Sequence, residues 1–342
     1  MKPMHVCKQL GKFVMAACIA AVFLTGFCFL YYNVPVHSEA EDGVTNYRWE
    51  KNVFYLEATE GLGWGKTNNE GYMNSFDYKD GDQVDVLLMG SSHMEGKQVP
   101  MSRLTSSRLN AMLTNKTVYN IGISGHDFLV CCGNLAAAVD KYQPSDYVII
   151  ETATLGFTEA QEEAVLSNEE APYEAHTGIV GVLQQNPFFR WSYTQLEKFM
   201  ERLDWPFDNK LKPIIEVQKD TDRNETSSHL QAPDRLLSNI SQLVAEKTGA
   251  TVIIVYHPGT WINQDGTLHL SIDGARDEFR ALCEENGIIF LDMSERFAVE
   301  YENHHILPHG FANSSVGSGH LNQYGHAMIA DELYRIMRGE VG

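Results

Sequence analysis

The chain has 342 residues, of which 44% are hydrophobic and 21% are charged, and this composition is typical of a globular protein. The formal net charge is −19, and residues 1–32 contain lysines but no acid, so the rest of the chain is more acidic still. A surface of this sign repels phosphate backbones, and no basic stripe interrupts it. These features exclude nucleic-acid binding as the function.

Residues 13–32 form an almost uncharged apolar run, long enough to cross the ~30 Å hydrocarbon core of a bilayer. Lysines precede this run and acidic residues follow it, which places the N-terminus in the cytoplasm and the bulk of the chain outside. We therefore predict a cytoplasmic tail at 1–12 and a single-pass plasma-membrane anchor at 13–32. The alternative is a signal peptide with a poor cleavage site at 38–40, which would make the protein secreted.

Residues 33–82 are polar and rich in turn residues, and they are interpreted as a stalk and an irregular N-terminal wrap. Five short apolar runs follow, each rich in Val and Ile, as expected of strands buried on both faces of a parallel sheet. Helical patterns lie between or after these runs, which predicts an α/β domain at 83–342 with a doubly wound, flavodoxin-like sheet. The strands are expected at 84–89, 117–121, 147–151, 251–256 and 288–292, and the helices at 128–142, 233–247, 272–286 and 324–337.

Residues 157–232 break this alternation. A structureless loop of that length is unusual, so we predict an inserted, partly helical cap with an aromatic amphipathic piece at 188–207. Six cysteines show neither a disulfide framework nor metal-like spacing. His304, His305 and His309 lie close together but lack supporting carboxylates, so they are interpreted as a solvated loop. No metal or cofactor is predicted.

Three polar segments are expected at the carboxyl ends of the strands, where α/β sheets bind ligands. Residues 90–96 (GSSHMEG) follow the first strand, residues 120–125 (NIGISG) end the second, and residues 319–326 (GHLNQYGH) precede the last helix. A serine lifted off a strand end, with a distant histidine to take its proton, is a common arrangement for a hydrolytic nucleophile.

The three segments resemble the sequence blocks of the SGNH (GDSL-like) hydrolase superfamily, and the resemblance covers about 82–340 apart from the insert. It implies that Ser92 is the nucleophile, with Ser91 in the place of the usual aspartate, and that His320 is the general base. It also implies an oxyanion hole that includes the N–H groups of Ser92 and Gly125.

The chain departs from the family pattern in two places. The family's third block supplies an asparagine that is missing at 148–154, where Thr152 or Thr154 is the candidate hydroxyl donor. The aspartate expected three residues before the histidine is replaced by Gly317. Because a histidine base needs an acceptor at its other ring nitrogen, we predict a backbone carbonyl or an acid from elsewhere, such as Asp292.

Three further residues, Asp127, His93 and Asn322, are candidates for orienting or supporting this site. The expected protein is an extracytoplasmic, membrane-anchored serine esterase or acyltransferase that removes or transfers O-acetyl (acyl) groups on cell-surface glycan. Members of the superfamily with this architecture resemble proteins that work with membrane-bound O-acyltransferases in alginate acetylation and teichoic-acid D-alanylation, so such an enzyme is the expected partner. The alternatives are a catalytically weakened glycan-binding or scaffold protein and a lipid-directed, lysophospholipase-like esterase.

Overall fold

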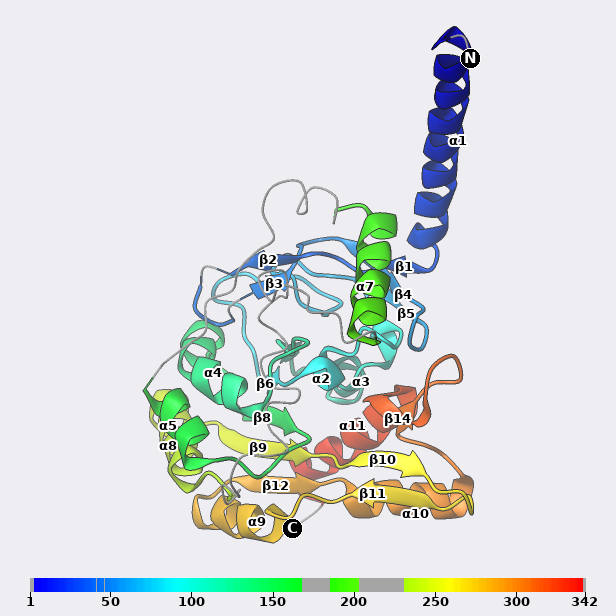
Figure 1. Ribbon diagram of the computed structural model, residues 1–342. Helices are drawn as coiled ribbons and strands as arrows, with labels where there is room; N and C mark the ends of the chain where they lie inside the picture. The colour runs from blue at the N-terminus through cyan, green and yellow to red at the C-terminus, as the bar shows by residue number, and fades with distance from the viewer. Residues whose placement is uncertain (1–2, 41, 46, 168–184, 203–230, 341–342) are drawn as a thin grey trace.

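A five-stranded parallel sheet forms the centre of the protein (Figure 1). The computed structural model describes residues 3–40, 42–45, 47–167, 185–202 and 231–340. The strands follow the flavodoxin-like order 2-1-3-4-5, which confirms the predicted fold class. From edge to edge they are β7 (Val118–Asn120), β6 (Val86–Met89), β8 (Tyr147–Thr152), β9 (Thr251–Tyr256) and β12 (Ile289–Asp292).

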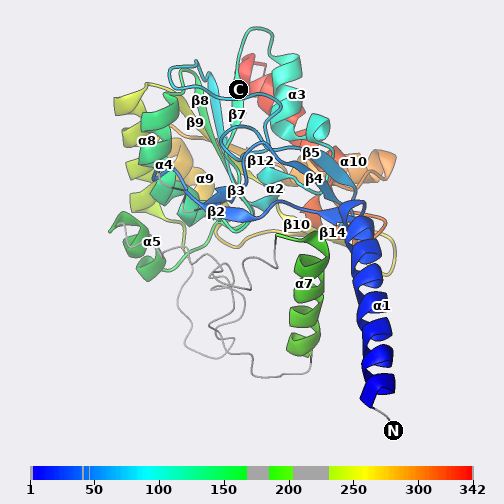
Figure 2. The ribbon, with the colours of Figure 1, turned by 90° about the horizontal axis from the view of Figure 1, so that it is seen from above.

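Helices cover both faces of this sheet (Figure 2). Successive residues of β6 enter opposite cores, Leu87 and Met89 on one side and Val86 and Leu88 on the other, which explains its unbroken hydrophobic run. The first core is closed by α4 (Phe128–Tyr142), α8 (Asp234–Lys247) and α9 (Arg276–Glu285), and the second by α3 (Thr105–Met112), α10 (Ser294–His304) and α11 (Gln323–Met337).

The helix predicted at 272–286 begins later than expected. Residues Leu268–Ser271 form β11, which pairs with β10 (Gly259–Ile262) as an antiparallel hairpin. Asp273 then accepts a 2.9 Å hydrogen bond from the Ala275 N–H immediately before α9. Residues 272–275 therefore form a turn between the hairpin and α9 instead of the first turn of the helix.

The segment at 33–82 is more regular than predicted. It contains a small antiparallel sheet of β1 (Tyr32–Asn33), β4 (Phe54–Glu57) and β5 (Gly63–Lys66). A second pair joins β2 (His37–Glu39) to β3 (Tyr47–Trp49). These strands position the loop after β4, which reaches the candidate site described below.

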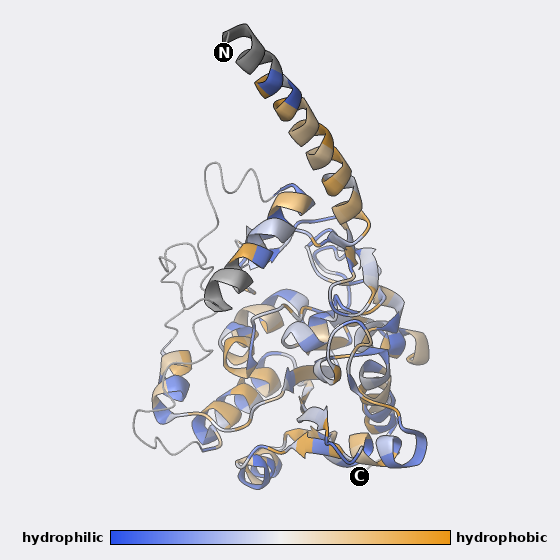
Figure 3. Cartoon of the chain, turned by 45° about the vertical axis from the view of Figure 1, so that its right-hand side comes forward, coloured by the Kyte–Doolittle hydropathy of each residue, from blue (hydrophilic) through white to orange (hydrophobic). Residues whose placement is uncertain are grey.

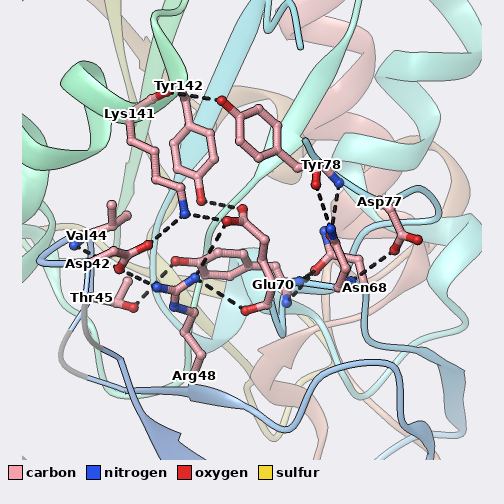
Figure 4. A network of polar contacts seen from close by, with 12 residues as sticks. Asp42, Val44, Thr45, Arg48, Asn68, Glu70, Asp77, Tyr78, Lys141 and Tyr142 are labelled. Atoms are coloured by element: carbon pink, nitrogen blue, oxygen red, sulfur yellow. Dashed lines mark hydrogen bonds and ion pairs between the residues drawn. The ribbon is translucent and has the colours of Figure 1, made fainter. Parts of the chain in front are cut away.

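A partly buried polar network fastens this N-terminal segment to α4 (Figure 4). Glu70 accepts hydrogen bonds from the hydroxyls of Tyr119 and Tyr142 at 2.8 and 2.7 Å, and it pairs with Lys141. Asp42 pairs with both Lys141 and Arg48. Because these side chains are largely shielded from water, each charge depends on its partners for stabilisation.

The Glu70→Gln variant is expected to lower the free energy of unfolding by about 2–4 kcal/mol, because Lys141 and Arg48 then lose a shared counter-charge in a partly buried site. Urea unfolding of the purified chain measures the change. The exposed Glu246→Gln variant is the control, and it should stay within about 0.5 kcal/mol of wild type. An equal loss in both variants would contradict the role of the network.

Acid is expected to weaken the contacts that Asp42 makes in the same network. Partial burial raises the pKa of Asp42, but its hydrogen bond to Lys141 and the charge of Arg48 outweigh this and lower the pKa below its usual value. The unfolded chain therefore takes up the proton first, so this stabilisation is present above about pH 4 and is lost as the pH falls through the folded-state pKa. Thermal unfolding between pH 5 and pH 2 should show a shallower pH dependence for Asp42→Asn than for wild type.

Helix α1 (Pro3–Phe29) extends away from the body of the protein and is apolar over most of its length (Figure 3). Its part at Gln9–Phe29 is long and apolar enough to cross a membrane, judged by length and composition, and an N-terminal signal sequence would share both properties. The insert contributes α5 (Glu159–Leu166) and α7 (Pro187–Arg202), and α7 packs against α1. The rest of the predicted cap, 168–184 and 203–230, lies outside the described residues.

Candidate active site

Ser92 begins α2 (Ser92–Glu95), a single helical turn at the carboxyl end of β6. The preceding Ser91 caps this turn, since its hydroxyl accepts a 3.2 Å hydrogen bond from the His93 N–H. Gly90 leaves room for Glu151, because a Cβ atom at Gly90 would lie 2.6 Å from the Glu151 Oε2 atom. Backbone crowding and capping together fix the place of Ser92 at the strand end.

His320 lies in β14 (Val316–Leu321) and meets Ser92 directly. Its Nε2 atom is 3.0 Å from the Ser92 Oγ atom, within hydrogen-bonding distance. The two residues are 228 positions apart in the sequence, so the fold alone brings them together. This is the contact that a hydroxyl nucleophile needs with its general base.

The other nitrogen of His320 is held by Glu60, a residue that the sequence analysis missed. The Nδ1 atom lies 2.7 Å from the Glu60 Oε2 atom, and the His320 backbone N–H donates to the other carboxylate oxygen at 3.2 Å. Partial burial raises the pKa of Glu60, but the hydrogen bond and charge of His320 outweigh this and lower the pKa below its usual value. A charged Glu60 keeps the proton on Nδ1 and leaves the Nε2 lone pair facing Ser92.

Backbone conformation explains why the acid does not come from position 317. Gly317 has a φ of +80°, and a Cβ atom there would lie 2.9 Å from the side chain of Ile262. Gly319 has a φ of +93°, and its missing side chain leaves room for Glu60. The loop of Glu60 is held in place by Asn313, whose side chain exchanges two 2.8 Å hydrogen bonds with the backbone of Gly61.

The prediction that Asp292 orients His320 is wrong. The Asp292 carboxylate pairs with Arg280 at 2.8 Å and accepts a 2.9 Å hydrogen bond from the Ser294 N–H, so it closes the end of β12 instead. The sequence correctly indicated the need for an acid but not its position.

Glu95 connects the nucleophile turn to the loop at 120–125. This buried carboxylate accepts hydrogen bonds from the Ser124 N–H at 3.1 Å and from the Trp49 indole at 2.6 Å. Gly125 follows with a φ of +91°, a conformation that favours glycine. Within the described part of the chain, the N–H groups of Ser92 and Gly125 have no protein acceptor in the hydrogen-bond network.

Thr152 is not a free donor, contrary to one of the two predictions for the missing asparagine. Its hydroxyl donates to the Thr154 carbonyl at 2.6 Å and accepts from the Thr154 N–H at 3.1 Å, so it closes a local turn. Thr154 is exposed and lines a cavity of about 380 Å³ together with Ser91 and Asp127. Thr154 therefore remains the candidate donor from this loop.

The other predicted support residues hold backbone near the site. Asp127 caps α4 by accepting a 3.0 Å hydrogen bond from the Val130 N–H. Asn322 caps α11 with its carbonyl oxygen, and its amide donates to the Leu307 carbonyl at 2.8 Å. The Nδ1 atom of His93 accepts a 3.2 Å hydrogen bond from the N–H of Leu321, the residue after His320.

A second cavity, of about 200 Å³, opens beside His320 and Glu60. Tyr32 and Lys97 form part of its wall, and Trp191 of α7 forms another part. Tyr32 lies three positions after the end of α1, so the N-terminal helix, the insert and the Ser92–His320–Glu60 group are neighbours.

No protein-family model matches the sequence, and no curated protein matches it. Several solved structures are similar. The YxiM protein of Bacillus subtilis is 12% identical with a TM-score of 0.42, and the match covers 82% of this chain and 61% of that one. A two-domain esterase (CEX) active on acetylated mannans is 12% identical with a TM-score of 0.40, covering 75% and 49%. A member of the lipolytic G-D-S-L family from Veillonella parvula is 15% identical with a TM-score of 0.37, covering 74% and 96%. The chain thus spans less than two thirds of the first two proteins.

Proposed function

We propose that this chain is an SGNH-type serine ester hydrolase or O-acyltransferase that works through an acyl-serine intermediate. The observation that carries the proposal is the continuous line of contacts from Ser92 Oγ to His320 Nε2 and from His320 Nδ1 to Glu60. Three distant segments supply these groups, and each group has the protonation partner that its role requires.

In the proposed reaction, Ser92 Oγ attacks an ester carbonyl while His320 Nε2 takes the hydroxyl proton. The tetrahedral intermediate expels the alcohol, which receives that proton from His320, and an acyl-serine remains. Water or a sugar hydroxyl then attacks the acyl-serine with His320 again acting as base. Hydrolysis and transfer differ only in this last acceptor.

The N–H groups of Ser92 and Gly125 are proposed to stabilise the negative oxygen of the intermediate, with Thr154 as the third donor. One such donor is worth roughly 3 kcal/mol of transition-state stabilisation. Glu95 contributes indirectly, because it holds the loop of Gly125 against the turn of Ser92 through Ser124.

Glu60 also bears on the alternative of a catalytically weakened scaffold protein. That alternative is motivated by the missing aspartate at 317 and by the missing asparagine at 148–154. Since Glu60 occupies the contact that an orienting carboxylate makes in a triad, the absence of an acid at 317 no longer argues against activity.

We propose that α1 anchors the enzyme in the plasma membrane, with the folded domain outside, and that the substrate is an acylated cell-surface glycan. A membrane-bound O-acyltransferase is the proposed partner. These proposals are supported by the length and composition of α1 and by the motif resemblance. The place of Tyr32 in the wall of the 200 Å³ cavity supports a site that faces the membrane surface.

A lipid-directed esterase is the second candidate, and the same cavity favours it. Trp191 of α7 lines the cavity beside Tyr32, and α7 packs against α1, so an acyl chain leaving the bilayer would meet this wall first. Both candidate functions use the same catalytic groups, and they differ in the length of the acyl chain on the substrate.

A chain-length panel tests the proposal and separates the two candidates. The purified full chain in detergent is assayed on p-nitrophenyl acetate, butyrate and palmitate and on an acetylated glycan, with Ser92→Ala as the background. A glycan O-acetylesterase should prefer acetate by at least about tenfold in kcat/KM, whereas a lipid-directed enzyme should prefer palmitate. Equal turnover by wild type and Ser92→Ala on every ester would overturn the enzymatic proposal.

A further inference from the structure

A group of three histidines lies at the nucleophile turn and takes no part in the proposed reaction. His257 follows β9, His309 lies in β13 (His309–Gly310), and His93 follows Ser92. Both His257 and His309 are fully buried. One nitrogen from each of the three rings lies within 4.8 Å of the others. Sequence reasoning did not group them, because they come from three separate segments.

Hydrogen-bond partners assign the protons on two of these rings. His257 Nε2 lies 2.7 Å from the Glu151 Oε1 atom, and since a carboxylate only accepts, Nε2 carries a proton. Thr260 donates its hydroxyl proton to the Gly317 carbonyl at 2.6 Å, so the same oxygen accepts from His309 Nδ1 at 3.0 Å. In their neutral forms, the two rings therefore turn two lone pairs, His257 Nδ1 and His309 Nε2, toward each other.

The separation of those two nitrogens is 3.4 Å. This is long for a hydrogen bond, whose donor and acceptor usually lie about 2.7–3.2 Å apart. It fits two ligands of one tetrahedral zinc ion, because Zn–N bonds of about 2.0–2.1 Å place the nitrogens about 3.3–3.4 Å apart. Two facing lone pairs also repel each other unless a cation lies between them.

The negative charge of Glu151 also supports a cation between the two rings. This carboxylate is fully buried and accepts hydrogen bonds from the Ser91 N–H and hydroxyl at 2.8 and 2.9 Å. Among the described residues, no lysine or arginine contacts it. A buried carboxylate that receives the N–H of a histidine is the usual second partner of a metal-binding imidazole, where it fixes the tautomer and offsets the charge of the ion. Thr260 supplies the equivalent partner for His309.

We propose that His93, His257 and His309 form a binding site for one divalent transition-metal ion of the zinc type. Three imidazoles with a fourth position left for water are a common zinc ligand set. The ion would link the end of β9, the strand β13 and the residue after the nucleophile. This proposal differs from the expectation from the sequence, which was that the protein binds no metal.

Ligation by His93 links this site to the catalytic segment. His93 Nδ1 accepts its hydrogen bond from the Leu321 N–H. A metal bound to Nδ1 would take that lone pair, and a metal bound to Nε2 would require the proton to move to Nδ1. Either way, the Leu321 N–H next to His320 loses its acceptor when the metal binds.

Titration of the chelator-treated, full-length protein with Co²⁺ in detergent tests the site, with Zn²⁺ as competitor. We expect one equivalent of Co²⁺ to give the visible absorption of a tetrahedral cobalt site and one equivalent of Zn²⁺ to remove it. His257→Ala and His309→Ala should weaken binding by at least about 100-fold, and Glu151→Gln by about 10- to 100-fold. The control is His304→Ala, because His304 is exposed at the end of α10 and should leave binding unchanged.

The wild-type titration decides the proposal even if a variant fails to fold. Absence of stoichiometric Co²⁺ binding by wild type would overturn it. Binding that survives in folded His257→Ala and His309→Ala variants would overturn it too. A third overturning result is an NMR spectrum in which His257 stays doubly protonated with excess Zn²⁺, since a proton then fills the gap between the two rings. Ester turnover by Ser92→Ala is a separate measurement, so failure of the metal site and failure of the enzymatic proposal are distinguishable.

Discussion

Ser92→Ala is expected to reduce ester turnover by on the order of 10⁴- to 10⁶-fold, to the background of the buffer, while the protein stays folded. The physical reason is that no other hydroxyl lies against His320 Nε2 among the described residues, so the acyl-enzyme cannot form. Steady-state hydrolysis of p-nitrophenyl acetate measures the loss, and circular dichroism confirms the fold.

The matched control is the neighbouring serine. Ser91 points its hydroxyl at Glu151 rather than at His320, so Ser91→Ala should lower stability by about 1–2 kcal/mol but keep turnover within about tenfold of wild type. The reverse pattern, with Ser91→Ala inactive and Ser92→Ala active, would show that the nucleophile has been assigned to the wrong residue.

Glu60→Gln is expected to lower kcat by about 10²- to 10⁴-fold with little change in KM. Loss of an orienting carboxylate leaves the histidine in the wrong tautomer for much of the time, and in a buried triad this costs about 10⁴-fold. Glu60 is partly exposed, which places the expected loss toward the lower end. Steady-state kinetics of the purified chain measures both constants.

Glu57→Gln is the control for this variant, because Glu57 lines the same cavity but bonds to Thr59 rather than to His320. It should retain near-normal kcat. A double variant, Glu60→Gln with Gly317→Asp, should not recover activity, since the positive φ and the Ile262 contact oppose a side chain at 317. Full activity in Glu60→Gln alone would remove Glu60 from the mechanism.

The sequence predicted the sheet because strand burial on both faces leaves a strong local signal. Each apolar run became a strand, and β9 matches its predicted range at both ends. The hairpin of β10 and β11 was missed because its short, half-exposed strands carry no comparable pattern. Local hydrophobicity thus predicts the buried strands of the central sheet better than the short hairpin outside it.

The contact between Ser92 and His320 was predictable from motifs, but the third member of the group was not. Glu60 has no motif around it, and the chain offers 45 acidic residues. Its role depends on a loop after β4 that Asn313 holds against β14, a contact between positions 252 apart. The sequence showed only that no acid stands at 317 or 319, where glycine occurs at both positions. The structure gives the reason, because a side chain at 317 would contact Ile262 and one at 319 would contact Glu60.

The histidines show the same limit of sequence proximity. His304, His305 and His309 are neighbours in the chain, yet His309 lies with His257 and His93 in the structure. His304 ends α10 and pairs with Glu300 in solvent. The interpretation of all three residues as a solvated loop is therefore wrong for His309, which is buried in β13.

Labelling with a fluorophosphonate, followed by peptide mapping, tests the central claim most directly, because it reports an activated serine without knowledge of the substrate. We expect one label per chain on Ser92 Oγ, formed at least about 100-fold more slowly in Glu60→Gln. A label on any other residue, or no label on the folded wild-type protein, would contradict the account.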